Sequence, residues 1–386
     1  MKAYYLWLVM CFGAGSSEIW KLLSRFQSPE GVYNAFRDNR SAAGRELNEK
    51  AAEYSIEDAK KKLSELSASG IAAVSTEDEE YPKTLREAEN PPVMLFIKGD
   101  KALLKNKLLT VVGARRITPY THEAQSRICK ELLSDYTLVT TLCEGCDQLS
   151  AVTSLCEGKP FIEIMPCSFN YEYPHGSNIL RQENIRRGGC SVTEYIFDTP
   201  PSSPYFQRRG RIIGGISPAA LIFQAGMGSG ALRTASFSKA PYFLPPYDLF
   251  SPEYGGAVSF IRRGALIFFD KSDLEIAYDP DFSGIELLPE RKKPKPKKDR
   301  QDENTAPKKE KAPVAEEVIP LGEESFESEL HYKVYEIISG AESAVPFDII
   351  LHKTGTDIAE LSEILLDLEI EGIVSPQPGN RFGLKV

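Results

Sequence analysis

The sequence predicts an α/β protein of three parts, in which a mostly parallel sheet lies between a small all-α N-terminal domain and a small C-terminal domain. Two observations carry this prediction. Between about residues 70 and 287, apolar runs alternate with segments of helical periodicity, a pattern typical of parallel strands covered by helices on both faces. The chain also has 386 residues, which is more than one domain usually contains.

Residues 1–68 are expected to form a helical domain of the SAM or helix-hairpin-helix type. Apolar residues recur at helical spacing on both sides of a Gly-Ala-Gly turn at residues 13–15, and Ser28 is a candidate N-cap with a proline after it. Such a turn either contacts a DNA backbone or simply connects two helices tightly. Because the helical pattern continues in register beyond the first residues, a cleaved export signal is the less favoured interpretation.

Residues 69–288 are expected to form the sheet domain, with a doubly wound, Rossmann-like arrangement. Nine apolar runs are candidate strands, at residues 72–74, 94–98, 108–112, 137–141, 161–165, 191–194, 220–224, 242–244 and 266–269. The candidate helices between them are residues 121–134, 148–156, 177–187, 204–214 and 231–238.

Three glycine-containing segments of this domain have the composition of a phosphate-binding surface. Residues 111–116 and 226–235 each follow an apolar run, and residues 206–217 carry three arginines before two glycines. Glycine lets the backbone approach a phosphate closely, and guanidinium groups bind its oxygens in pairs. An arginine cluster alone is more often a solvated surface or a set of ion pairs. The common position of these segments at strand ends or helix starts favours one shared site.

Composition limits the kind of site that the chain can carry. A formal net charge of -9 argues against indiscriminate coating of nucleic acid, so a polyanion site has to be a local basic patch. Cys143 and Cys146 form a CxxC pair, but no second pair stands at zinc spacing. Seven cysteines without a disulfide framework favour the reducing cytoplasm, and no apolar run is long enough to span a membrane.

The C-terminal part is predicted to be a charged linker followed by a winged helix. Residues 289–327 are rich in Lys, Pro and Glu and cannot bury a core. Residues 328–386 contain three candidate helices, at 330–338, 345–352 and 356–371, and a strand pair at 372–376 and 381–385. The third helix contains several carboxylates and no Lys or Arg, so phosphates would repel it. We therefore expect a protein contact from this module rather than major-groove binding.

This order of domains, together with a set of short motifs, resembles the DNA-processing protein A family (DprA, also called Smf). The matching segments are Gly-Ala-Arg at 113–115, Gly-Cys-Asp at 145–147, Tyr-Pro at 173–174, Glu-Tyr at 194–195, Arg-Arg-Gly-Arg-Ile-Ile at 208–213, Ser-Gly at 229–230 and Thr-Ala at 234–235. The resemblance covers nearly the whole chain. It implies a cytoplasmic DNA-binding protein without enzymatic activity or cofactor, which binds single-stranded DNA and loads the RecA recombinase during natural transformation (competence) or recombination. A homodimer formed through the Rossmann-like domain is also implied.

The resemblance places DNA phosphates on an arginine-lined pocket at the strand ends. The residues expected to bind phosphate are Gly113, Arg115, Arg116, Arg208, Arg209, Arg211, Ser229, Gly230 and Arg233. Phe206 or Tyr205 is a candidate for base stacking, although a core role for Phe206 is equally compatible with the sequence.

Several residues depart from the family pattern. Glu144 places a negative charge near the expected phosphate track, and Thr141 replaces a glycine. Ala151, Gln207 and Gln224 stand where histidine, proline and glutamate are common in the family. These changes leave the predicted fold intact but predict a weaker or altered polynucleotide site.

Two other functions remain open at this point. A nucleotide-binding Rossmann enzyme would need a reactive constellation, yet no His or Lys stands beside the candidate acids Asp147 and Glu194 in a recognisable motif. A structural role is favoured for both, as a loop or helix cap for Asp147 and as an arginine partner for Glu194. No Walker loop is present, and residues 226–230 lack the dinucleotide-binding spacing. The second alternative is an interaction scaffold whose DNA site has decayed, which the acidic third helix and Glu144 favour.

Overall fold

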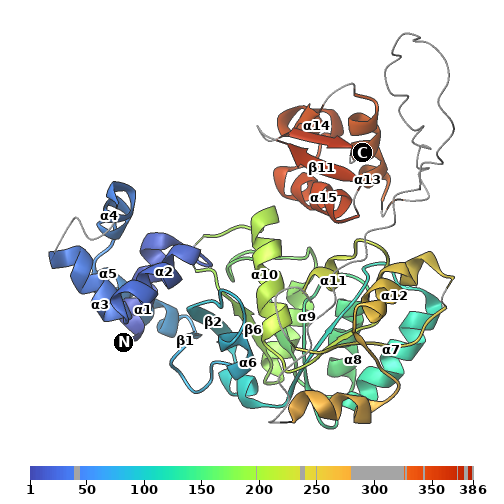
Figure 1. The fold of residues 1–386 in the computed structure, drawn as a ribbon, viewed down its shortest axis with the longest axis horizontal. Coiled ribbons are helices and arrows are strands. Elements are labelled where there is room, and N and C mark those ends of the chain that lie inside the picture. Colours follow the sequence, from blue (N-terminus) through green and yellow to red (C-terminus); the bar gives the residue numbers. More distant parts are fainter. Residues whose placement is uncertain are drawn as a thin grey trace, which may run out of the picture.

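The computed structural model describes residues 1–38, 44–196, 198–234, 240–248, 250–279, 326, 328–341, 344–371, 373–377 and 381–384. The expected linker at 289–327 lies outside the described residues except for Phe326. Phe326 was wrongly assigned to the linker, because its ring is buried in the core of the C-terminal domain. Figure 1 shows a helical N-terminal domain beside a central α/β domain, and a small C-terminal domain above the central one.

The described residues of the N-terminal part form five helices around an aromatic and aliphatic core. Trp7 lies fully buried in this core, where it packs against Phe12 and Phe36. Ser28 accepts a hydrogen bond from the N–H of Gly31 at 2.9 Å, as expected of an N-cap. The helices are α1 (Lys2–Phe12), α2 (Ser17–Phe26), α3 (Pro29–Asp38), α4 (Arg45–Ala51) and α5 (Ile56–Ala68).

The central domain is built on one sheet of nine strands, each of which overlaps a strand expected from the sequence. The strands are β1 (Ile71–Ser75), β2 (Met94–Gly99), β3 (Leu108–Val112), β4 (Thr137–Thr140), β5 (Ile162–Ile164), β6 (Cys190–Thr193), β7 (Ala220–Ile222), β8 (Tyr242–Leu244) and β9 (Leu266–Ile267). Their order is β1-β2-β6-β5-β4-β3-β7-β8-β9. All neighbours from β6 to β9 are parallel, whereas β1 and β2 add an antiparallel edge.

Helices cover both faces of this sheet, so the prediction of a doubly wound α/β domain is confirmed. One face is covered by α6 (Lys83–Arg86), α10 (Ser203–Gly215), α11 (Gly230–Arg233) and α12 (Gly255–Arg262). The other is covered by α7 (Pro119–Leu132), α8 (Cys146–Cys156), α9 (Asn178–Arg186) and the 3-10 helix η4 (Lys271–Tyr278). The expected end of the fifth helix at 235–238 lies outside the described residues.

The strand order creates a crevice at β3. From β3 the chain proceeds outward through β4, β5 and β6 and then returns through α10 to β7, on the opposite side of β3. The loops after β3 and β7 therefore diverge at the carboxyl edge of the sheet. Ligands of open α/β sheets bind at such a switch point.

The C-terminal domain has the predicted winged-helix architecture. Its helices are α13 (Glu329–Ser339), α14 (Phe347–Thr354) and α15 (Ile358–Ile370), and its strands are β10 (Val345–Pro346), β11 (Val374–Gln377) and β12 (Arg381–Leu384). The expectation that the second helix begins at Val345 was wrong, because Val345 and Pro346 instead pair with Phe382 and Arg381 as a third strand. Among the described residues, no helix combines the length and the apolar character needed to cross a bilayer.

Candidate nucleic-acid interface

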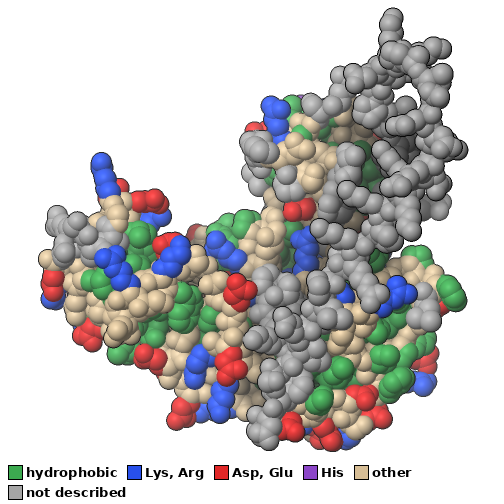
Figure 2. Space-filling view, viewed as in Figure 1, with side chains coloured by type: hydrophobic (Ala, Val, Ile, Leu, Met, Phe, Trp, Pro, Cys, Tyr) green, Lys and Arg blue, Asp and Glu red, His purple; other side chains and the backbone are tan. Residues whose placement is uncertain are grey.

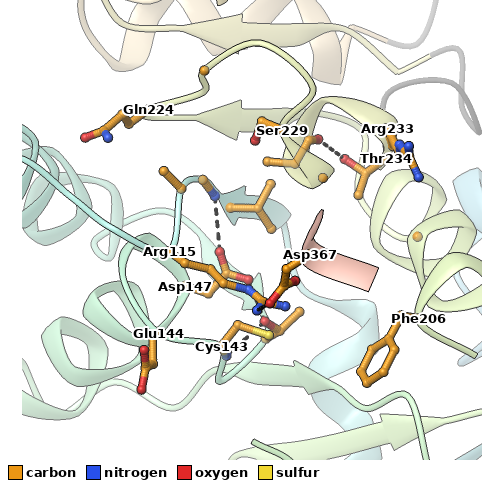
Figure 3. Close-up of a pocket in the computed structure, with 18 of the residues that line it drawn as sticks. Arg115, Cys143, Glu144, Asp147, Phe206, Gln224, Ser229, Arg233, Thr234 and Asp367 are labelled. Carbon is orange, nitrogen blue, oxygen red and sulfur yellow. Dashed lines mark hydrogen bonds and ion pairs between the residues drawn. The ribbon is translucent and has the colours of Figure 1, made fainter. Parts of the chain in front are cut away.

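A pocket of about 560 Å³ opens at the switch point of the sheet. Its walls are the loops after β3, β4 and β7 and one side of α10, and three residues of the winged-helix domain complete it. Figure 3 shows these side chains converging from separate elements. The three glycine-containing segments were expected to share one site, and residues of all three line this pocket.

Gly145 fixes the loop after β3 against the loop after β4. Its φ is +77°, and a Cβ atom at this position would lie 2.1 Å from the carbonyl oxygen of Arg115. Beside it, the N–H of Cys146 donates to the carbonyl of Ala114 at 3.0 Å. Only glycine fits this approach, and the approach determines where the backbone of Arg115 lies.

Asp147 holds the same two loops together from beneath the pocket. Its carboxylate accepts the N–H of Gly113 at 3.1 Å and the hydroxyl of Thr141 at 2.5 Å. Burial raises the pKa of Asp147 to about 6. The amide of Gly113 is therefore already engaged within the chain, and Gly113 contributes to the pocket by its small size rather than as a donor. Asp147 has the structural role that its sequence position indicated.

Gln224 positions the segment that follows Arg116. Its Oε1 accepts from the N–H of Thr118 at 3.0 Å and from the hydroxyl of Thr121 at 2.8 Å, while its Nε2 donates to the carbonyl of Arg116 at 2.9 Å. In this chain the amide of Gln224 thus both donates and accepts, which a carboxylate could not do. The sequence marked Gln224 only as a departure from the family pattern, and its hydrogen bonds depend on the folded arrangement of two loops.

Four of the expected phosphate-binding arginines line the pocket: Arg115, Arg116, Arg209 and Arg233. Ser229 and Gly230 line it as well, at the start of α11. The N–H of Ser229 donates to the carbonyl of Gly226 at 3.2 Å, so this amide is used in the turn.

Arg208 and Arg211 do not line this pocket. Arg211 is buried and forms an ion pair with Glu194 at the end of β6, and it donates to the carbonyl of Asn90 at 2.6 Å. Arg208 donates to the carbonyl of Ala14 at 3.0 Å. Both arginines thus have structural partners, and the interpretation of Glu194 as an arginine partner is confirmed.

The Gly-Ala-Gly turn of the N-terminal domain packs directly on these two arginines. A Cβ atom on Gly15, whose φ is +68°, would lie 2.7 Å from Nη2 of Arg211 and 3.2 Å from Cδ of Arg208. The structure therefore favours a tight structural connection for this turn, the second of the two interpretations that the sequence left open.

Arg209 extends into the pocket from the same turn of α10. Its guanidinium lies 5.6 Å from the ring centroid of Phe206, and Nη2 is 3.7 Å from Sγ of Cys143. Nε of Arg209 is buried and has no hydrogen-bond partner among the residues that the structure describes. Phe206 also packs on Tyr173, with centroids 4.7 Å apart, so it supports Arg209 from below. Tyr205 instead packs on Tyr195 and is not part of the pocket wall.

The winged-helix domain reaches into the pocket through α15. Arg115 forms an ion pair with Asp367, and its Nη1 lies 3.6 Å from a carboxylate oxygen of Glu363. The hydroxyl of Tyr173 donates to Glu363 at 3.1 Å. Burial opposes the charge of Arg115, but Asp367 and its neighbours raise the pKa of Arg115 well above its usual value. Arg116 donates in addition to the carbonyl of Phe326.

The pocket wall offers little for covalent or metal chemistry. Within the described ranges, no group of three or more His, Cys, Asp and Glu side chains is arranged to hold a metal ion. Cys146 is buried under Gly113, and burial raises the pKa of its thiol. Those lining residues that the structure describes include no histidine and no lysine.

Comparison with known proteins identifies the family. A family model described as DNA recombination-mediator protein A matches residues 50–278, which is more than half of the chain. The chain belongs to the DprA/Smf family. A second model, the DprA winged helix domain, matches residues 323–380 of this DprA/Smf protein.

Curated relatives agree with this assignment. The DNA processing protein DprA of Bacillus subtilis is 29% identical over 227 residues, which is 58% of this chain and 73% of the relative. Protein Smf of Escherichia coli is 25% identical over 316 residues, or 81% of this chain and 77% of the relative. The X-ray structure of DprA from Streptococcus pneumoniae superposes with a TM-score of 0.61 at 22% identity, covering 71% of this chain and 97% of that one, and shows the same fold.

Proposed function

We propose that this DprA/Smf protein binds single-stranded DNA in the switch-point pocket and acts as a recombination mediator. The observation that carries the proposal is Arg209, whose buried Nε lacks a partner among the described residues while its guanidinium lines a glycine-walled pocket. An unpaired guanidinium nitrogen is costly unless a ligand completes its hydrogen bonds. A DNA phosphate has the charge and the geometry that a guanidinium binds best.

Backbone contacts of this kind support binding that is independent of base sequence. Arg115, Arg116 and Arg233 line the same pocket as Arg209, and the guanidinium of Arg209 lies over the ring of Phe206. Phosphate contacts position a strand, whereas base edges specify it. We therefore expect the affinity for single-stranded DNA to fall steeply with salt concentration and to depend little on base sequence.

The wider role follows from family membership. As a DprA/Smf protein, the chain is proposed to deliver the bound strand to RecA in DNA processing and natural transformation, in the cytoplasm and without catalysing a reaction. A homodimer through the Rossmann-like domain belongs to the same proposal. Ile267 and Phe269, at the β9 edge of the sheet, are 42% and 70% exposed and would suit such a contact.

Fluorescence anisotropy with labelled oligo-dT over a salt series tests the DNA site. Arg209→Ala should weaken binding and reduce the slope of log K against log salt by about 0.7, the value for one phosphate of a single strand. Arg186→Ala is the matched control, because Arg186 is exposed on α9, outside the pocket wall, and its ion-pair partner in the described part of the chain is Glu183. Equal binding by wild type and Arg209→Ala would remove the pocket from the DNA path.

The scaffold alternative retains one specific observation in its favour. Carboxylates of α15 already neutralise Arg115, so the pocket could serve the contact between domains rather than DNA. Absence of oligo-dT binding at low salt, both in wild type and after the α15 carboxylates are neutralised, would favour the scaffold.

A further inference from the structure

We propose that α15 of the winged-helix domain is an internal competitor of DNA, which pairs two carboxylates with the expected phosphate-binding residue Arg115 and adds negative charge to the pocket wall. This inference rests on the proposed function, because it assumes that DNA phosphates bind where α15 now lies. The partner of the acidic helix is thus the arginine pocket of the same chain.

The contact geometry resembles recognition of a phosphate. Asp367 and Glu363 stand one helical turn apart on α15, so both carboxylates face the guanidinium of Arg115. The two carboxylates place several anionic oxygens around one guanidinium, and a phosphodiester would supply the same arrangement. Figure 3 shows Asp367 beside Arg115 within the pocket.

The charge balance of the pocket depends on the winged-helix domain. Among the described lining residues there are four arginines and five carboxylates, and two of these carboxylates, Asp367 and Glu371, come from the winged-helix domain. Without them, arginines outnumber carboxylates. Figure 2 shows acidic side chains at the lower edge of the winged-helix domain directly above basic side chains of the central domain. Docking of α15 therefore removes the positive potential that would attract a strand.

The docked carboxylate is buried and compensated from another domain. The side chain of Asp367 is only 7% exposed; among the described residues it forms an ion pair with Arg115, and Nε2 of His331 lies 3.3 Å from its carboxylate. Arg115 is the partner that belongs to the central domain. A buried ion pair adds little net stability, because desolvation of the two charges offsets their attraction. Removing one partner nevertheless costs several kcal/mol, because the other charge stays without compensation. Undocking of α15 therefore needs a replacement anion for Arg115. DNA supplies such an anion.

The competition is intramolecular and therefore independent of protein concentration. A tethered ligand meets its site at a high effective concentration, which lowers the apparent affinity of a free competitor. Thermodynamic linkage makes the effect reciprocal. The factor by which docked α15 lowers the affinity for a DNA strand equals the factor by which a bound strand lowers the docking equilibrium of α15. DNA binding would then expose the acidic face of α15 to other proteins.

Neutralising the two carboxylates in the full chain tests the inference. Glu363→Gln with Asp367→Asn keeps side-chain size and hydrogen-bonding capacity but removes both charges. We expect oligo-dT to bind about ten-fold more tightly to this variant than to wild type at low salt. The matched control is Glu360→Gln with Glu369→Gln, which makes the same charge change on α15 at residues that form no ion pair within the described part of the chain. The control should bind like wild type.

Arg209→Ala in both backgrounds separates this inference from the proposed function. If DNA uses the pocket, Arg209→Ala weakens binding with or without the α15 carboxylates. If Arg209→Ala weakens binding but the double variant binds no better than its control, the competition is wrong and the DNA site stands. If Arg209→Ala changes neither background, the DNA site itself is wrong.

Small-angle X-ray scattering of the full chain adds a readout that does not require DNA affinity. The radius of gyration should rise in the Glu363→Gln/Asp367→Asn variant and, for wild type, on saturation with unlabelled oligo-dT. An unchanged radius of gyration in both cases would overturn the competition. Circular dichroism establishes that the variant is folded, because both substitutions are on one helix of the winged-helix core.

Discussion

Arg115 and Asp367 are separated by 252 positions in the chain, yet their side chains form an ion pair between the central and winged-helix domains. This pair joins the loop after the first parallel strand, which the sequence marked as a phosphate site, to the helix that the sequence marked as too acidic for DNA. Each residue explains an unusual feature of the other. The acidic helix has a cationic partner, and the cationic loop has an anion within the same molecule.

The buried carboxylate of Asp147 should make stability depend on pH. Its folded-state pKa of about 6 lies above the unfolded value of 3.8, so the folded state binds the proton more tightly. Stability is then greatest below about pH 4 and falls as the pH rises to about 6, by roughly 3 kcal/mol for this group. Asp147→Asn retains an acceptor for Gly113 and cannot titrate. The wild-type minus variant difference in unfolding free energy, measured by urea denaturation from pH 4 to 7, should show this fall, and parallel curves would contradict it.

Gln224→Glu should destabilise the loop after β3. An ionised glutamate cannot donate to the carbonyl of Arg116, and leaving that pair unmade costs about 1–3 kcal/mol. The same substitution should weaken oligo-dT binding, since the loop carries Arg115 and Arg116. Gln207→Glu is the matched control for thermal stability alone, because Gln207 is exposed but lies on the pocket wall, where a new charge would itself oppose DNA. Equal thermal stability of the two variants would argue against the positioning role of Gln224.

Gly145→Ala should disrupt the pocket more than its backbone conformation alone requires. Gly145 and Gly158 both have positive φ, at +77° and +68°, but a Cβ on Gly158 meets nothing within 4 Å. Gly158→Ala should therefore cost about 1 kcal/mol, from conformational strain alone. Gly145→Ala adds a collision with the carbonyl of Arg115, and the ψ of −128° at Gly145 lies outside the left-handed helical region, so this change should cost several times more. Thermal unfolding of both variants measures the difference, and similar losses would show that the loop can move aside.

Arg211→Ala should reduce stability strongly, because it leaves Glu194 buried without its cation. Removal of one partner of a buried pair costs about 3–5 kcal/mol. Replacing both residues, as in Arg211→Met with Glu194→Gln, should recover much of this loss. Denaturant unfolding gives the values, and oligo-dT binding per folded molecule should stay near wild type because Arg211 lies outside the pocket wall. A stable Arg211→Ala protein with weakened DNA binding would return Arg211 to the DNA site.

Much of the fold could be predicted from local patterns in the sequence. Buried parallel strands are nearly continuous apolar runs, so all nine strands of the central sheet were located within a few residues. The position of the pocket followed as well, because glycine segments after strands meet at one sheet edge. The strand at Val345 was missed, since two residues that include a proline carry no strand pattern.

The roles of individual side chains were harder to predict, because they depend on contacts between distant segments. A helix turns by about 100° per residue, so the neighbouring arginines of α10 point in different directions that composition does not reveal. Gln224 bonds to a loop more than a hundred positions earlier, and its amide is informative only once that loop is in place. The acidity of α15 was evident, but its target was not.

The divergence of the α10 arginines has a genetic consequence. Arg208 reaches the N-terminal domain, Arg209 the pocket and Arg211 the sheet. Substitutions at these three arginines should therefore fall into three phenotypic classes. Suppressors should lie in the Gly13–Gly15 turn for Arg208, in α15 for Arg209 and near Glu194 for Arg211. A mutational scan scored both for protein abundance and for transformation would separate neighbouring codons that look interchangeable in the gene.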